Sequence, residues 1–136
     1  VENVPGYAVI GEAECEGQLE QAMPAMEELI RLQSDGTVVM ALNDPSALGA
    51  IAALEEAGLD SVLVYGIDGT PDMKTRIAAY PDRYVSVAQS PISIGSIAAQ
   101  TMYDCLAGKQ VQHRIDVPVS LIDRDTIDGY SLTGWQ

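Results

Sequence analysis

Three polar side chains each stand at the point where an apolar, strand-like segment of the sequence ends. They are Asn43 after residues 38–42, Asp68 after residues 62–65, and Gln89 after residues 84–88. Within three residues each is followed by a proline, which suits the first turn of a helix. Parallel strands place their carboxyl ends at one edge of a sheet, where α/β proteins bind ligands. We therefore expect the three side chains to form one binding site.

The hydrogen-bonding chemistry of this triplet favours a polyol. Asn and Gln each offer two donors and an acceptor, and an ionised Asp offers acceptors only, whereas sugar hydroxyls both donate and accept. A phosphate group would instead require Arg or a nest of backbone N–H groups. Each residue also has a structural interpretation. Asn43 or Asp44 could cap the following helix, Asp68 could serve the turn before Gly69, and Gln89 could satisfy backbone groups at a strand end.

The elements that would position the triplet alternate along the chain. Besides the three strands, we expect a short strand at residues 7–10 and an extended segment at 111–122. The predicted helices cover residues 19–32, 45–57, 71–79 and 92–106. Pro24 lies inside the first of these, so we expect the regular helix to begin near Met23. This alternation predicts an α/β fold, a doubly wound parallel sheet of the Rossmann-like kind, in a single domain spanning residues 1–136.

Composition narrows the classes of partner. With 47% hydrophobic residues the chain has the make-up of a globular protein, and its net charge of −13 repels nucleic acids and anionic lipid headgroups. No apolar run reaches the roughly 20 residues that span a bilayer. The first residues do not resemble a signal peptide, so we expect either a cytoplasmic protein or a mature chain without its targeting segment.

Catalytic, cofactor and metal motifs are missing from the sequence. It contains neither a phosphate-binding P-loop nor a dinucleotide fingerprint, and the acidic stretches 12–16 and 123–129 lack the spacing of a calcium loop. The only histidine, His113, is predicted to lie on the surface. We therefore expect no enzyme activity, no cofactor and no metal. Cys15 and Cys105 are predicted to be buried free thiols.

A phosphate-receiver domain is the α/β alternative that Asp68 suggests, because a phosphoacceptor aspartate occupies such a strand end. That chemistry also needs an acidic pair after the first strand and a lysine after the last one. The last strand here runs instead into Gln89-Ser90-Pro91. The receiver interpretation is therefore disfavoured.

Three motifs resemble a known family. NDPSALGAIAALEEAG (43–58), VYGIDGTPD (64–72) and VAQSPISIGSIAAQTMYDCLAGK (87–109) are similar to the ribose-binding-protein type of bacterial ABC-importer sugar receptors, which are type 1 periplasmic binding proteins. The resemblance implies a receptor that works outside the cytoplasmic membrane, where its two lobes close on a monosaccharide and deliver it to an ABC permease in the membrane. Asp68 favours a neutral monosaccharide, because a carboxylate would repel an acidic one. In this lobe Asn43, Asp68 and Gln89 would bind the sugar. Cys15 and Ile67 stand near positions that are often aromatic in relatives, so the resemblance implies polar contacts and leaves stacking from this lobe in question.

The same resemblance implies that a lobe is missing. The chain corresponds to the C-terminal lobe, and residues 91–113 would pack on the N-terminal lobe of a longer parent protein. Without it, we expect the apolar face of helix 92–106 to be covered by a homodimer or by repacking. Two other functions stay open at this point. One is an effector-binding domain of a lactose-repressor-type regulator, and the other is a receptor for a sugar-like autoinducer.

Overall fold

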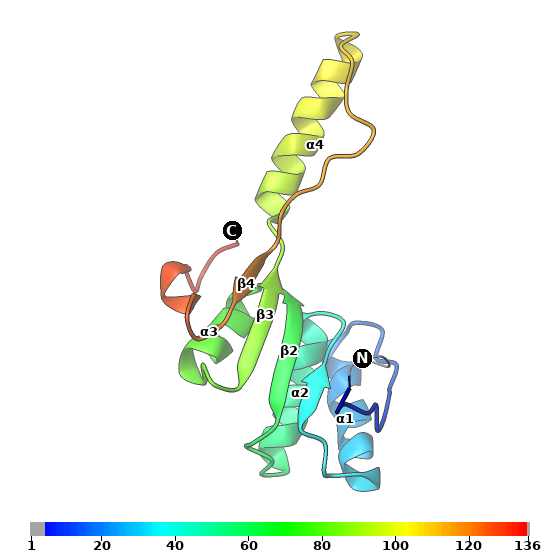
Figure 1. Ribbon diagram of the computed structural model, residues 1–136, viewed down its shortest axis with the longest axis vertical. Coiled ribbons are helices and arrows are strands. Elements are labelled where there is room, and N and C mark those ends of the chain that lie inside the picture. Colours follow the sequence, from blue (N-terminus) through cyan, green and yellow to red (C-terminus); the bar gives the residue numbers. More distant parts are fainter. Residues whose placement is uncertain (1–4, 136) are drawn as a thin grey trace.

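The computed structural model describes residues 5–135 and shows a four-stranded sheet flanked by helices, with one long helix projecting from it (Figure 1). In chain order the elements are α1 (Leu19–Leu32), β1 (Val38–Met40), α2 (Asp44–Glu56), β2 (Leu63–Asp68), α3 (Pro71–Ala79), β3 (Tyr84–Ala88), α4 (Pro91–Leu106), β4 (Ser120–Ile122) and the 3-10 helix η1 (Ile127–Gly129).

The sheet has the strand order β1-β2-β3-β4. Strands β1, β2 and β3 are parallel, with Val39 opposite Val64 and Val64 opposite Tyr84. Strand β4 runs antiparallel to β3 and pairs Ser120 with Ala88. The predicted α/β fold with a mostly parallel, open sheet is thus confirmed.

The hydrophobic core lies on one face of this sheet. Because right-handed crossovers that advance in one direction put their helices on the same side, α2 and α3 both cover this face. The core side chains from helices and strands include Ile51, Leu54, Met73, Ile77, Val64, Tyr84 and Ile122, all at most 1% exposed.

The opposite face of the sheet has no helix over it among the described residues, and it is apolar. Met40 and Tyr65 are paired across β1 and β2 and are 69% and 38% exposed. Ile67 and Leu121 continue this open face across β2 and β4, at 39% and 50% exposure.

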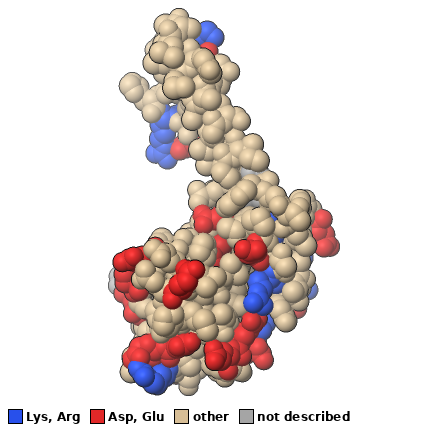
Figure 2. Space-filling model, turned by 180° about the vertical axis from the view of Figure 1, so that it is seen from behind, with Lys and Arg blue, Asp and Glu red and all other residues tan. Residues whose placement is uncertain are grey.

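Helix α4 forms an arm that leaves the sheet after β3, and residues 107–119 return along it toward β4 (Figure 1). No residue of α4 is buried. Large apolar side chains are exposed along it, among them Met102, Tyr103 and Leu106 at 57–78%. Acidic side chains lie over the body of the molecule, whereas the arm carries few charged groups (Figure 2).

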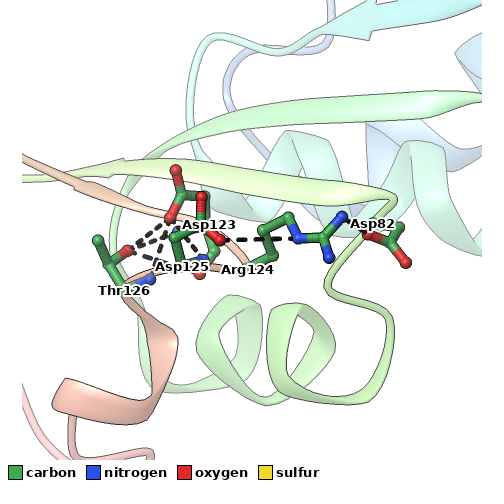
Figure 3. A network of polar contacts seen from close by, with 5 residues as sticks. All are labelled: Asp82, Asp123, Arg124, Asp125 and Thr126. Carbon is green, nitrogen blue, oxygen red and sulfur yellow. Dashed lines mark hydrogen bonds and ion pairs between the residues drawn. The ribbon is translucent and has the colours of Figure 1, made fainter.

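The tail after β4 is fastened to the body by polar contacts (Figure 3). Arg124 donates to Asp82, in the turn between α3 and β3, with 2.6 Å between Nη1 and Oδ1. The Asp123 carboxylate accepts hydrogen bonds from the backbone N–H of Asp125 and from the backbone N–H and hydroxyl of Thr126. Asp123 therefore stabilises a turn.

Residues 7–10 were predicted as a strand, and that prediction is wrong. The segment is irregular and exposed. It lies beside α1, where the side chain of Leu29 approaches Gly11, and the side chain of Ile10 approaches Gly36 in the loop after α1. A short β-prone segment becomes a strand only when it pairs. The neighbouring edge strand β1, at three residues, offers few backbone groups for pairing.

Helix α1 begins at Leu19, so the predicted start near Met23 is also wrong. Pro24 removes only one backbone hydrogen bond, the one to the carbonyl of Glu20. Tertiary packing outweighs this loss, because the first turns of α1 lie directly against α2 at Gly49. A Cβ placed on Gly49 would be 2.6 Å from the carbonyl oxygen of Leu19.

Two further predictions need correction. Of residues 111–122, only Ser120–Ile122 form a strand, because β3 ends at Ala88 and provides a partner for those three residues alone. Both cysteines are free, but neither is buried. Cys15 is half-buried, with its Sγ 3.3 Å from the hydroxyl of Ser46, and Cys105 is exposed on the arm.

Two helical glycines give a matched test of this packing. Gly49→Ala is expected to lower the free energy of unfolding by about 1–3 kcal/mol, because the new methyl would overlap the backbone of α1. Gly95→Ala in α4 meets nothing within 4 Å, so it should leave stability unchanged or raise it by up to about 1 kcal/mol. Urea unfolding followed by circular dichroism measures both. A Gly49→Ala protein as stable as wild type would contradict the close α1–α2 contact.

Candidate ligand site

Two members of the predicted triplet meet at the carboxyl ends of neighbouring parallel strands. Asp68 ends β2, and Gln89 follows β3 directly. The side-chain amide of Gln89 donates to the Asp68 carboxylate, with 2.9 Å between Nε2 and Oδ1, and its backbone N–H donates to the Asp68 carbonyl at 3.1 Å. The site therefore presents a carboxylate and an amide that already orient each other.

These two side chains border an open hollow of about 540 Å³. The remaining lining residues are Pro91, Ile92, Ile94 and Trp135. The hollow thus has one polar edge and apolar walls that come from the start of α4 and from the end of the tail. Ligand pockets commonly combine a few polar groups with apolar walls in this way.

Asn43, the third member, has a structural role in this structure. It is the N-cap of α2, where its Oδ1 accepts from the backbone N–H of Ser46 at 3.0 Å and from the Ser46 hydroxyl at 2.7 Å. Its Nδ2 donates to the carbonyl of Gly17 at 3.0 Å. Asn43 does not line the hollow, so the structure brings two of the three predicted residues together and leaves the third on the neighbouring strand end.

The backbone at Asp68 is strained. Asp68 has φ of +126°, a region that residues with a side chain rarely occupy, and the following Gly69 has φ of +74°. Such a conformation costs of order 1–3 kcal/mol and persists only where surrounding contacts impose it. The hydroxyl of Thr70 then caps α3 by accepting from the backbone N–H of Met73.

Asp44, which the sequence suggested only as a possible cap of the helix from Pro45, imposes this conformation. Its side chain is fully buried. One carboxylate oxygen accepts from the backbone N–H of Thr70 and the other from the hydroxyl of Ser86, both at 2.7 Å. The Ser86 hydroxyl in turn accepts from the backbone N–H of Gly69 at 3.1 Å. One buried carboxylate thus fixes both residues that follow Asp68.

A signal for this network was present in the sequence. Ser86 interrupts the buried strand YVSVA, and Gly66 stands in the middle of the strand that ends at Asp68. A Cβ on Gly66 would be 2.4 Å from a carboxylate oxygen of Asp44, so only glycine leaves room for it. Small residues at neighbouring positions of β2 and β3, Gly66 and Ser86, thus indicated that another side chain packs against the two strands there.

Burial dominates the electrostatics of Asp44. Removal from water raises the pKa of its carboxyl above the usual 3.8, and the nearby charge of Asp68 raises it further. Hydrogen bonds from Ser86 and Thr70 act in the opposite direction, because they stabilise the ionised form.

Residues 5–135 contain no group of three or more His, Cys, Asp or Glu side chains placed to hold a metal ion. Within the same range, none of the helices has the length and apolarity needed to cross a membrane.

Comparison with known proteins gives consistent matches. Residues 1–110 match the periplasmic binding protein domain family. The chain is 40% identical over 103 residues to the ribose import binding protein of Bacillus subtilis (strain 168), and 35% identical over 107 residues to that of Escherichia coli (strain K12). These alignments cover 74% and 75% of this chain but 32% and 34% of the relatives. The chain therefore spans about a third of the length of these relatives.

A solved structure agrees with the sequence matches. The ABC transporter solute binding protein of Bacillus halodurans C-125, solved with bound myo-inositol, superimposes with a TM-score of 0.85 at 28% identity. The superposition covers 95% of this chain and 45% of that one. The fold is thus that of one part of a larger solute-binding protein.

The buried carboxylate predicts a specific pH dependence. Because the folded protein holds the Asp44 proton more tightly than the unfolded chain does, this group stabilises the fold most at low pH. That contribution falls as pH rises from 3.8 through the raised pKa, and then levels off. Asp44→Asn keeps an acceptor for Thr70 and a polar group for Ser86 without titrating. The difference in unfolding free energy between wild type and Asp44→Asn should therefore decline with rising pH.

Two variants serve as controls for this measurement. Asp44→Ala leaves the N–H of Thr70 without its acceptor and should cost about 1–3 kcal/mol more than Asp44→Asn. Asp35→Asn, at an exposed position, reports the general effect of losing one negative charge. A wild-type to Asp44→Asn difference that is the same at all pH values would contradict the assignment.

Proposed function

This chain belongs to the periplasmic binding protein family, and on that premise we propose that it is one lobe of the sugar-binding component of an ABC importer. The observation that carries the proposal is the pairing of Asp68 with Gln89 at the mouth of an open hollow. Both are hydrogen-bonding side chains with room for a ligand beside them. The relatives named above are ribose import binding proteins, and the B. halodurans structure holds myo-inositol, so the proposed ligand is a neutral monosaccharide or a similar polyol.

Asp68 and Gln89 are the proposed sugar ligands of this lobe, with Asn43 as a third. One amide hydrogen of Asn43 is used by the carbonyl of Gly17, which leaves the second for a hydroxyl. The carboxylate of Asp68 binds hydroxyl donors, and it disfavours acidic sugars because the two charges would repel.

A second lobe is part of the proposal. The hollow is open on one side, and the relatives are about three times as long as this chain. Residues 91–113, which include the unburied helix α4, are proposed to pack on an N-terminal lobe in a longer parent protein. That parent would work outside the cytoplasmic membrane and deliver its sugar to an ABC permease. Closure of two lobes would then supply the missing wall of the site.

Sugar binding by this chain tests the proposed function. D-ribose, D-allose and myo-inositol are titrated into the labelled protein, and backbone amide shifts are followed by NMR. Binding in the millimolar range is expected, because half of the cleft is missing. Asp68→Asn should weaken binding about tenfold or more, since hydrogen bonds to a charged group contribute about 1.5–3 kcal/mol.

The matched control is Asp35→Asn, which lies away from the hollow and should bind like wild type. Absence of shifts with all three ligands, each at a 100-fold molar excess over the protein, would count against sugar binding by this lobe. Equal binding by Asp68→Asn would count against the site.

The exposed area supports self-association of the isolated chain. Its accessible surface is 8914 Å², whereas a compact monomer of 14.5 kDa exposes about 6,900 Å². Covering half of that excess on each of two copies would bury roughly 2,000 Å² in total, the size of a stable homodimer interface. We propose a homodimer through α4, residues 92–106, whenever no other lobe is present.

Light scattering after size exclusion tests this dimer. Wild type is expected to have twice the mass of one chain. Met102→Glu combined with Leu106→Glu should give the monomer, because a buried charge without a partner opposes association. Leu32→Glu on α1, which is equally exposed, should leave the dimer intact. A wild-type monomer that binds no apolar dye would overturn the proposal.

A further inference from the structure

We infer that Trp135 is a ring-stacking, specificity-determining residue of the sugar site. This inference rests on the proposed function, because it assigns the apolar part of the same site. Trp135 lines the hollow together with Asp68 and Gln89. It is 46% exposed, so a large part of the indole is open to a ligand.

The tail holds Trp135 in place. The carbonyl of the preceding Gly134 accepts a hydrogen bond from the Lys74 ammonium of α3, whose residue is 1% exposed. Farther back, Ile127 of η1 is buried in the core and Tyr130 packs against it. The ion pair between Arg124 and Asp82 fixes the start of the tail (Figure 3). Trp135 therefore follows a segment that is anchored at several points, and these contacts fix its position beside the hollow.

The two sides of the hollow have different chemistry. Asp68 and Gln89 form a polar edge, and Pro91, Ile92 and Ile94 add to the indole to form an apolar wall. A cyclic sugar has the same division, because its hydroxyls lie around the rim and its C–H groups form apolar faces. An indole ring offers a flat apolar surface of the size of such a face. The polar edge and the apolar wall together therefore suit a cyclic polyol.

The apolar wall and the polar edge distinguish cyclic ligands from open-chain polyols. A pyranose or a cyclitol presents a flat C–H face to Trp135 while its hydroxyls reach Asp68 and Gln89. An open-chain polyol with the same hydroxyls has no such face and must also lose more conformational freedom on binding. The site should therefore prefer the ring to the open chain, and Trp135 should be the source of that preference.

The sequence provides its own reporter, because Trp135 is the only tryptophan. D-allose, myo-inositol and the open-chain allitol are each titrated into the 136-residue chain while tryptophan fluorescence is recorded. The two cyclic ligands should change the emission, and allitol should bind at least about fivefold more weakly. NMR titration gives the affinities of the variants that lack the fluorophore.

Three variants complete the test. Trp135→Ala should weaken binding of the cyclic ligands about fivefold to tenfold and remove their advantage over allitol, whereas Trp135→Phe should retain most of both. Leu132→Ala, in the same tail but outside the hollow, should bind like wild type. The role of Trp135 would be overturned if the cyclic ligands left the wild-type emission unchanged and bound Trp135→Ala as tightly as wild type. If sugar binding still depended on Asp68, the proposed function would stand. No sugar binding by wild type would overturn both.

Discussion

The buried carboxylate of Asp44 is the constraint on which the rest of this structure depends. Asp44 is the first residue of α2, yet both of its carboxylate oxygens accept hydrogen bonds from other elements. One accepts from the backbone N–H of Thr70, the N-cap of α3, and the other accepts from the hydroxyl of Ser86 in the middle of β3. Gly66 leaves the space for it in β2. Two strand-to-helix transitions and the middle of β3 are thus tied to one ionisable group, which is why the turn at Asp68 keeps a backbone conformation that a free chain would avoid.

The buried core and the exposed apolar surfaces lie in different parts of this chain. On one face of the sheet α2 and α3 enclose a core whose large side chains are almost fully buried. On the other face, and along α4, apolar side chains remain at the surface. The site lies at the border of the two regions, because β2 and β3 end there and α4 begins there. A ligand there would lie between the strand ends of the sheet and the exposed start of α4.

The sequence predicted what depends on local pattern and missed what depends on distant contacts. Apolar runs and proline positions located β2, β3 and the helices, and they placed Asp68 beside Gln89. Residues 7–10 resembled a strand, but strand formation needs a partner. Pro24 suggested a late helix start, but packing against Gly49 outweighed one lost hydrogen bond. Trp135 is far along the chain from Asp68, and no local pattern links the two; only the fastened tail brings them to one hollow.

The pairing of Ala88 with Ser120 has a consequence for how the arm is attached. The chain leaves the body at one member of this pair and re-enters at the other, so β3 and β4 form a hairpin whose loop is the whole of residues 89–119. The entropic cost of closing a loop grows only with the logarithm of its length, so this long excursion costs the body little more than a short turn would.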